Sequence, residues 1–340
     1  MESPRVSLVV TSIAEPTEIL RSLASGSQAK GWSFIMIGDA KSPSGFFLEG
    51  CDYYDIRRQV RLGLKFAQAA PLNHYARKNI GYVLAARSGA AMIVETDDDN
   101  CPVGGFWSAR TRTQRLPVCR DGGWVNAYQY FSESHIWPRG FPLDLIQQAV
   151  PAWERLPTEV VDCPIQQGLA DANPDVDAIY RLVCSLPQTF RGDRRIALSM
   201  GTWCPFNSQN TTWWREAYPL MYLPTYCSFR MTDIWRSFVA QRIAWENRWG
   251  VMFHEPTMRQ ERNEHNLMKD FEDEVVGYLK NKDICEALSS LKLRAGTDHV
   301  GENMILCYET LIGMGLLAQG ELDLLAYWLS DMALGVTATR

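Results

Sequence analysis

The stretch that decides the fold is Ala91-Met92-Ile93-Val94-Glu95-Thr96-Asp97-Asp98-Asp99-Asn100. It begins as an apolar run of strand length and then places three carboxylates in succession. Ionised carboxylates beside an apolar core cost several kcal/mol unless a partner compensates them. A divalent cation such as Mg²⁺ or Mn²⁺ is a natural partner, because it prefers carboxylate oxygen and often carries the phosphates of a substrate. The alternative is a solvated acidic turn, so the rest of the sequence has to decide between the two.

Strands and helices alternate along the first hundred residues. We expect strands at 6–10 and 34–37, a helix at 16–23 between them, and a helix at 73–88 before the acidic run. This alternation predicts a parallel α/β sheet with right-handed crossovers. Open α/β sheets bind ligands at the carboxyl ends of their strands. That edge is predicted to gather Thr11, Ser12, Asp39, Asp97, Asp98 and Asp99.

The later sequence predicts one more strand and then helices. A strand that returns to the sheet is expected at 196–200, and a helix with an apolar face at 234–246. From about residue 266 the pattern is helical to the end. We therefore predict a sheet-containing domain at 1–265 and a helical C-terminal subdomain at 266–340 that packs on it.

Composition excludes several classes of protein. The net charge of −5 gives no electrostatic footprint for nucleic acid. The nine cysteines are scattered without a CxxC pair, which argues against a zinc knuckle and for reduced thiols. No signal peptide precedes the first strand, and no apolar run reaches the ~20 residues that span a bilayer. We therefore expect a cytoplasmic chain, unless it is a fragment of a longer membrane-anchored protein.

The acidic run supplies the first candidate ligands for a metal. In an extended turn alternate residues point the same way, so Asp97 and Asp99 can share one cation while Asp98 faces ribose or sugar. His254 and His265 are candidate additional ligands from late in the chain. A lone histidine is more often a structural residue than a ligand.

Cationic and amide side chains are candidates for the other parts of a nucleotide-sugar. Arg77 and Lys78 lie on the predicted helix, and Arg139 lies in the turn Trp-Pro-Arg-Gly-Phe-Pro at 137–142. Arginine forks match phosphate geometry, although helix cations are often simply solvated. The stretch Pro-Phe-Asn-Ser-Gln-Asn-Thr at 205–211 is rich in groups that bind sugar hydroxyls, or that form local turns. Its candidate sugar ligands are Asn207, Gln209 and Asn210.

Asp233 begins the predicted helix at 234–246. One interpretation is an N-cap that satisfies free backbone amides. The other is a carboxylate that binds or deprotonates an acceptor hydroxyl. The sequence leaves both open.

With these residues identified, the chain resembles the STELLO family of glycosyltransferase-like proteins. Besides the acidic run, the matching stretches are 31–39, 75–82, 137–143, 205–211, 233–236 and 328–331, so the similarity covers nearly the whole chain. Plant members are type II Golgi membrane proteins tied to cellulose synthesis, and they carry an Asp-Asp-Arg-like run in place of the acidic run. This chain lacks their cytosolic tail and membrane helix, so the resemblance implies the Golgi lumen only for a truncated chain.

A weaker similarity links the chain to the reversibly glycosylated polypeptides, which are UDP-arabinopyranose mutases. It rests on the triple Asp followed by Cys101 and on Arg139-Gly140-Phe141-Pro142. The arginine of that stretch is the self-glycosylated residue of that family. Both resemblances imply a GT-A fold, a UDP-sugar donor and Mn²⁺ or Mg²⁺.

We therefore expect a GT-A type, Rossmann-like α/β fold and a metal-dependent hexosyl- or pentosyltransferase of polysaccharide biosynthesis. Thr11 and Asp39 would hold uridine, and Asp233 would act as the base for inverting transfer to a glycan, lipid-linked or protein acceptor. The alternatives are a mutase that is glycosylated at Arg139 and a non-catalytic scaffold. Peripheral membrane contact and a homo-oligomer built on the apolar C-terminal helices stay open, and no nucleic acid partner is expected.

Overall fold

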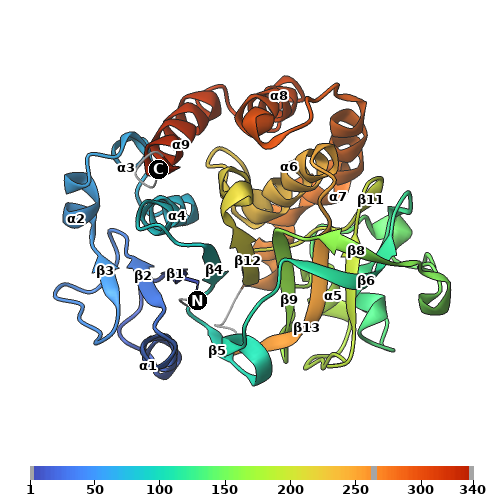
Figure 1. The fold of residues 1–340 in the computed structure, drawn as a ribbon, viewed down its shortest axis with the longest axis horizontal. Coiled ribbons are helices and arrows are strands. Elements are labelled where there is room, and N and C mark those ends of the chain that lie inside the picture. The colour runs from blue at the N-terminus through green and yellow to red at the C-terminus, as the bar shows by residue number, and fades with distance from the viewer. Residues whose placement is uncertain (1–3, 262–265, 337–340) are drawn as a thin grey trace.

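The computed structural model of the chain describes residues 4–261 and 266–336. Within this part, eleven strands form one sheet in the order β3-β2-β1-β4-β12-β9-β13-β10-β6-β8, with β5 paired to β13 outside this order (Figure 1). The strands are β1 (Val6–Thr11), β2 (Ser33–Ile37), β3 (Asp52–Tyr54), β4 (Met92–Thr96), β5 (Asn100–Pro102), β6 (Thr113–Cys119), β8 (Thr158–Asp162), β9 (Ile165–Asp171), β10 (Arg195–Leu198), β12 (Asn210–Trp214) and β13 (Val251–Gln260). A separate short pair consists of β7 (Gly123–Trp124) and β11 (Thr202–Trp203).

The sheet is parallel in its first part and mixed in its second. Strands β1 to β4 pair in parallel, as the alternation of strands and helices predicts. Beyond them, β12 runs antiparallel to both β4 and β9, and β10 runs antiparallel to β13. The strand expected at 196–200 is β10. The fully parallel sheet is therefore confirmed only for the first hundred residues, where helices make the crossovers.

Helices cover both faces of this sheet. They are α1 (Glu18–Lys30), α2 (Ile56–Arg61), α3 (Lys65–Ala69), α4 (Lys78–Arg87), α5 (Ala178–Val183), α6 (Thr232–Glu246), α7 (Leu267–Ser290), α8 (Val300–Gly313) and α9 (Glu321–Val336). The helices expected at 73–88 and 234–246 correspond to α4, preceded by the 3₁₀ turn η1 (Tyr75–Arg77), and to α6. The helix expected at 16–23 is longer: the hydroxyl of Thr17 caps α1, which continues until Gly31 ends it with φ 66°.

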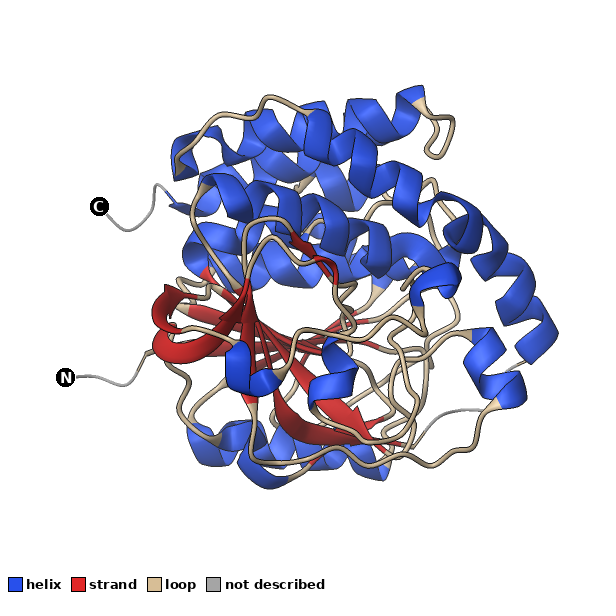
Figure 2. Ribbon diagram, turned by 90° about the vertical axis from the view of Figure 1, so that its right-hand side faces the viewer, coloured by secondary structure: helices blue, strands red, loops and turns tan. Residues whose placement is uncertain are grey.

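The alternation of side chains along β1 builds a core on each side of the sheet. Leu8 and Val10 point to the face covered by α1, where they pack with Leu20 and Leu23. Val9 points to the opposite face and joins the larger core with Ile80 of α4. Figure 2 shows most of the helical mass stacked on one side of the sheet and smaller helices on the other.

The C-terminal helices are joined to the sheet-containing part by buried polar contacts. The Asp331 carboxylate accepts a hydrogen bond of 2.8 Å from the backbone N–H of Phe66. The Glu321 carboxylate accepts others from the backbone N–H groups of Thr225 and Tyr226. A packed helical addition is thus present, while its separation into a subdomain at 266–340 stays a prediction.

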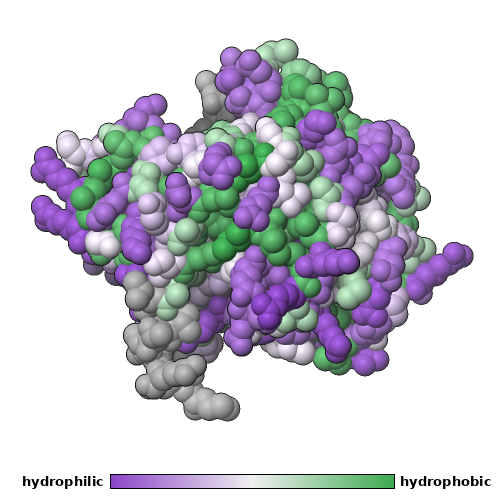
Figure 3. Space-filling model, turned by 90° about the horizontal axis from the view of Figure 1, so that it is seen from above, coloured by the Kyte–Doolittle hydropathy of each residue, from purple (hydrophilic) through white to green (hydrophobic). Residues whose placement is uncertain are grey.

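The surface seen from above carries an apolar patch (Figure 3). Helices α8 and α9 run along this side, and Ile305 and Leu306 of α8 are 38% and 40% exposed. The predicted homo-oligomer remains a prediction. All nine cysteines are free, as expected. In the described part of the chain, every helix is too short or too polar to cross a bilayer.

Candidate functional site

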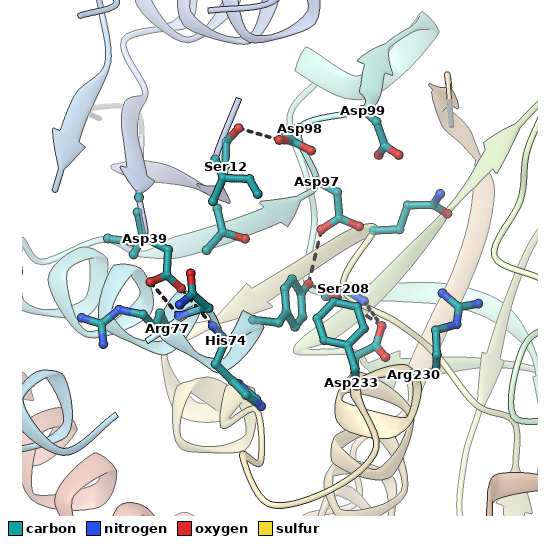
Figure 4. Close-up of a pocket in the computed structure, with 18 of the residues that line it drawn as sticks. Ser12, Asp39, His74, Arg77, Asp97, Asp98, Asp99, Ser208, Arg230 and Asp233 are labelled. Atoms are coloured by element: carbon teal, nitrogen blue, oxygen red, sulfur yellow. Dashed lines mark hydrogen bonds between the residues drawn. The ribbon is translucent and has the colours of Figure 1, made fainter. Parts of the chain in front are cut away.

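A cavity of about 380 Å³ opens at the carboxyl ends of β1, β2 and β4. The structure brings together there the strand-end residues that the sequence predicts, namely Thr11, Ser12, Asp39, Asp97, Asp98 and Asp99. Figure 4 shows Ser12 and Asp39 at one end, Arg230 and Asp233 at the other, and the three aspartates along the side between them. The cavity therefore has two distinct ends, which we call the β1–β2 end and the α6 end.

Each aspartate of the acidic run is held by a different element. Asp97 Oδ1 accepts hydrogen bonds from Lys78 Nζ at 3.0 Å and from the Tyr75 hydroxyl at 3.3 Å. The Ser12 hydroxyl donates to Asp98 at 2.5 Å, and the Gln260 amide donates to Asp99 at 3.1 Å. Burial raises the pKa of Asp97 and of Asp98, whereas Lys78 and Ser12 respectively act to lower them.

Lys78 is neither a solvated helix cation nor a free phosphate ligand. Its side chain is completely buried, and its ammonium donates to the Thr96 carbonyl at 2.7 Å, to Asp97 and to the Tyr75 hydroxyl at 3.2 Å. An ammonium has three protons, so these bonds use its donors. Lys78 lies outside the cavity lining and binds Asp97, so the structure does not support a direct contact between Lys78 and the donor.

Arg77 lines the β1–β2 end of the cavity but is almost completely buried. Its guanidinium donates to the Gln59 side-chain oxygen at 3.0 Å and to the Ala70 carbonyl at 2.9 Å. Burial lowers its pKa. These bonds fix the guanidinium on the Asp39 side of the cavity, away from the acidic run, so the predicted role as a phosphate ligand is not supported (Figure 4).

Asp39 connects the end of β2 to the segment before α4. Its two carboxylate oxygens accept backbone N–H bonds from Asn73 at 2.8 Å and from His74 at 2.9 Å. The His74 Nδ1 atom accepts from the backbone N–H of Ala76, and burial lowers the pKa of this histidine. The β1–β2 end thus combines one fixed carboxylate with a neutral imidazole.

Arg139 is bound on several sides. Asp175 accepts two hydrogen bonds from its guanidinium, each of 2.8 Å, and Asp233 accepts a third of 2.9 Å. The Arg230 carbonyl accepts a fourth. Burial acts to lower the pKa of Arg139, but the two carboxylates raise it well above its usual value. A guanidinium that stays charged and bonded in this way is a poor nucleophile, which argues against self-glycosylation at Arg139.

Asp233 does not cap its helix. Helix α6 begins at Thr232, so Asp233 lies within the first turn, and its carboxylate accepts from the Ser208 backbone N–H and hydroxyl, each at 3.3 Å. Burial acts to raise the pKa of Asp233, but Arg139, Arg236 and the Ser208 backbone N–H together lower it below its usual value. Asp233 is therefore an ionised carboxylate on the wall of the cavity.

The predicted sugar-binding amides are only partly in the cavity. Gln209 lines it. Asn207 instead forms an Asx turn, in which its side-chain oxygen accepts from the Gln209 backbone N–H at 3.0 Å. The Asn210 amide donates to the Thr257 hydroxyl at 2.8 Å and lies outside the cavity lining. Both amides thus serve local structure and neither residue lines the cavity, while the sugar-binding roles of Asn207 and Asn210 stay predictions.

Only one of the two candidate histidine ligands lies in the described part of the chain. His265 lies outside the described residues. His254 lies on β13 outside the cavity lining, with Nδ1 3.0 Å from the Glu255 carbonyl oxygen, and burial lowers its pKa to about 4. Among residues 4–261 and 266–336, no three His, Cys, Asp or Glu side chains are grouped to hold a metal. Among the described residues, the predicted metal ligands that line the cavity are therefore the carboxylates of the acidic run.

Several cavity residues were not predicted from the sequence. They are Tyr75, Asp175, Ser208, Phe229, Arg230 and Gln260. Tyr75 and Ser208 lie inside matched stretches, and Phe229 and Arg230 lie four and three residues before Asp233. For Asp175 and Gln260 no local pattern gives a signal, because only the fold brings them to the cavity.

A mixed sheet flanked by helices, with a polar cavity at the ends of its first parallel strands, is consistent with a GT-A-like glycosyltransferase fold. The family model of the STELLO glycosyltransferases matches residues 230–337. Two Arabidopsis thaliana proteins are similar to the chain: probable glycosyltransferase STELLO2 is 29% identical over 288 residues, and probable glycosyltransferase STELLO1 is 28% identical over 271 residues. These matches show that the chain is similar to the STELLO glycosyltransferases, which confirms the resemblance found in the sequence.

The matches cover most of this chain and a smaller part of its relatives. They span 78% and 74% of the chain, but 37% of STELLO2 and 34% of STELLO1. The chain therefore corresponds to about a third of each relative's length.

Proposed function

We propose that this chain transfers a sugar from a UDP-sugar to an acceptor, with Mn²⁺ or Mg²⁺ held by Asp97 and Asp99. The observation that carries the proposal is the position of the acidic run, between a polar end at Ser12 and Asp39 and a second end that contains Asp233. The cavity volume of about 380 Å³ falls in the range of ordinary small-molecule sites.

The acidic run fits a metal that is bound together with a diphosphate. Mg²⁺ is commonly held by one or two carboxylates plus substrate phosphates rather than by an all-protein cage. The bonds described for Asp97 use its Oδ1, and its side chain is 32% exposed, so the carboxylate is reachable from the cavity. Such a metal would neutralise the charge that develops on the departing diphosphate.

The β1–β2 end is suited to the nucleoside. Thr11, Ser12 and Asp39 offer hydroxyl and carboxylate groups at the strand ends, where open α/β sheets bind nucleotides. The backbone bonds to Asp39 hold its carboxylate in one orientation. A ribose hydroxyl can donate to the remaining lone pairs of such a carboxylate.

The α6 end is suited to the acceptor. An acceptor hydroxyl near Asp233 would donate a hydrogen bond to its carboxylate. As the hydroxyl oxygen bonds to the anomeric carbon, the bond from that carbon to the diphosphate oxygen breaks and the hydroxyl proton passes to Asp233. Arg139 orients this carboxylate through its bond of 2.9 Å, and a single displacement of this kind inverts the anomeric centre.

A binding protein without turnover is the second candidate. The observation that favours it is the ion pair of Lys78 and Asp97, because it already compensates one carboxylate of the acidic run. Such a protein would bind UDP or a UDP-sugar and release no UDP. The mutase alternative is disfavoured by the bonds that hold Arg139.

Calorimetric titration of UDP with and without Mn²⁺ tests the proposal. The wild type and Asp99→Asn would be compared with Asp298→Asn, which changes an exposed carboxylate elsewhere. We expect metal-dependent binding that is lost only in Asp99→Asn, followed by UDP release from at least one UDP-sugar. Binding without release from any UDP-sugar would favour the non-catalytic alternative, and binding of GDP but not UDP would contradict the donor assignment.

A further inference from the structure

An exposed aromatic ring stands at the α6 end of the cavity. Phe229, in the 3₁₀ turn η7 (Phe229–Met231), lines the cavity and is 56% exposed. Its ring meets Tyr75 edge to face, with centroids 5.8 Å apart and an interplanar angle of 68°. Phenylalanine normally contributes to stability by burial. A ring that is held by one neighbour but left open to the cavity is therefore available to a ligand.

The ring lies on the acceptor side of the proposed reaction. Phe229 precedes Asp233 by one helical turn, and Tyr75, which holds the ring, bonds to the Ser208 hydroxyl beside Asp233. Ser12 and Asp39 lie at the opposite end (Figure 4). A group that stacks on Phe229 would thus lie near Asp233 and away from the nucleoside.

The wall around the ring is polar but carries little net charge. Arg230 pairs with Glu274 at 2.7 Å, and Arg139 pairs with Asp175 and Asp233. Two guanidinium groups therefore face three carboxylates, a formal sum of −1. An anionic acceptor such as a lipid phosphate gains no attraction from such a wall. A neutral ligand that both donates and accepts hydrogen bonds suits it better.

A neutral sugar ring combines the features that this wall matches. Its C–H face packs on an aromatic ring, while its hydroxyls reach carboxylates and amides at the ring edge. Gln209 and Gln260 line the same cavity and are 5% and 8% exposed, and the Gln260 amide nitrogen donates to Asp99 at 3.1 Å. The aromatic ring, the two amides and the paired charges are together suited to bind a carbohydrate acceptor.

We propose that Phe229, with Gln209 and Gln260, forms a subsite that binds a neutral glycan acceptor by stacking one sugar ring on Phe229. This inference rests on the proposed function, because it takes Asp233 as the group that meets the acceptor hydroxyl. It selects the glycan among the three acceptor classes and assigns Phe229 a role in acceptor specificity.

The test measures binding of neutral tetrasaccharides by saturation-transfer NMR, with and without UDP and Mn²⁺. The variants are Phe229→Ala, Phe229→Trp as the conservative replacement, and Phe47→Ala as a control at a ring that is 79% exposed and outside the cavity lining. We expect Phe229→Ala to weaken tetrasaccharide binding roughly tenfold, as loss of a stacked ring implies. Phe229→Trp and Phe47→Ala should bind like the wild type.

Other results would overturn the subsite. Equal binding by Phe229→Ala and the wild type would remove Phe229 from acceptor recognition. Binding of a polyprenyl phosphate but of no neutral tetrasaccharide would assign the acceptor to lipid. UDP titration separates this inference from the proposed function: tetrasaccharide binding that depends on Phe229 without any UDP binding would overturn the donor assignment and keep the subsite.

Discussion

The ammonium nitrogen of Lys78 lies 3.0 Å from Oδ1 of Asp97, and the lysine is completely buried while the carboxylate is 32% exposed. The first aspartate of the acidic run thus forms an ion pair with a buried residue of helix α4. The same ammonium binds the Thr96 carbonyl, so it also fixes the backbone at the end of β4. Lys78 is therefore a positioning residue for Asp97.

Lys78→Met should destabilise the fold through this pair. Removing one partner of a buried pair leaves the other charge uncompensated, which typically costs 3–5 kcal/mol. Because Asp97 is partly exposed, we expect the free energy of unfolding to fall by about 3 kcal/mol in urea titrations. The double variant Lys78→Met/Asp97→Asn should recover most of this loss. Strict additivity of the two single variants would mean that the pair carries no coupling energy.

Asp97→Asn and Asp99→Asn should affect UDP binding differently. Replacing Asp97 removes the counter-ion of Lys78 and leaves a positive charge beneath the cavity. We therefore expect Asp97→Asn to lose metal-dependent affinity but to bind UDP several-fold more tightly than the wild type when Mn²⁺ is absent. Asp99→Asn should only lose affinity. Titration calorimetry in chelator and in Mn²⁺ measures both, and identical behaviour of the two variants would contradict an electrostatic role for Lys78.

The sequence predicts the edge of the sheet better than the α6 end of the cavity. Thr11, Asp39 and Asp97 follow strands whose apolar runs are evident locally, and parallel strands must bring their carboxyl ends together. Asp175 and Gln260 reach the cavity from β-rich segments whose pairing is long-range. Local pattern does not encode that pairing.

Lys78 and Asn210 were predicted to face the donor, and the structure gives both side chains other partners. Lys78 follows an arginine on a helix, a pattern typical of solvated cations, yet packing against β4 buries it completely. Asn210 lies in an amide-rich stretch, yet strand pairing directs its amide toward Thr257. In both cases the residue type indicated a polar role. The orientation of the side chain, however, depended on tertiary contacts.

A buried ion pair also connects β4 to α6. Glu95 accepts a hydrogen bond of 2.9 Å from Arg236 and one of 2.8 Å from the Trp213 indole, and both members of the ion pair are fully buried. Glu95→Gln should lower the free energy of unfolding by about 3–5 kcal/mol, because the Arg236 charge then lacks its partner. The control Glu246→Gln, in a partly exposed pair with Arg242, should change it by less than about 1 kcal/mol. If chemical denaturation showed equally small changes in the free energy of unfolding for Glu95→Gln and Glu246→Gln, the stabilising role of the buried ion pair would be contradicted.

Asp233→Asn should separate donor binding from transfer. Asn preserves the size of the side chain, and Arg139 keeps its two bonds to Asp175. We expect UDP affinity to stay within about twofold and sugar transfer to fall by roughly 10²–10⁴, the range of general-base catalysis. Normal specific activity with reduced thermal stability would instead assign Asp233 a structural role.

His254 should make the fold sensitive to acid. In the unfolded chain a histidine has a pKa of 6.5, whereas burial lowers the pKa of folded His254 to about 4 against the opposing influence of Glu255. Between these values the unfolded state binds more protons, so stability rises with pH and is lost as pH falls from 6.5 to 4. At 1.36 kcal/mol per pKa unit, protonation of His254 lowers the free energy of unfolding by about 3 kcal/mol over this range.

The variant His254→Gln should lack this loss. The difference in free energy of unfolding between the variant and the wild type should therefore change by about 3 kcal/mol between pH 7 and pH 4. The nearby Arg110 and Arg195 do not titrate in this window, and a constant difference across it would show that His254 titrates as it does in the unfolded chain.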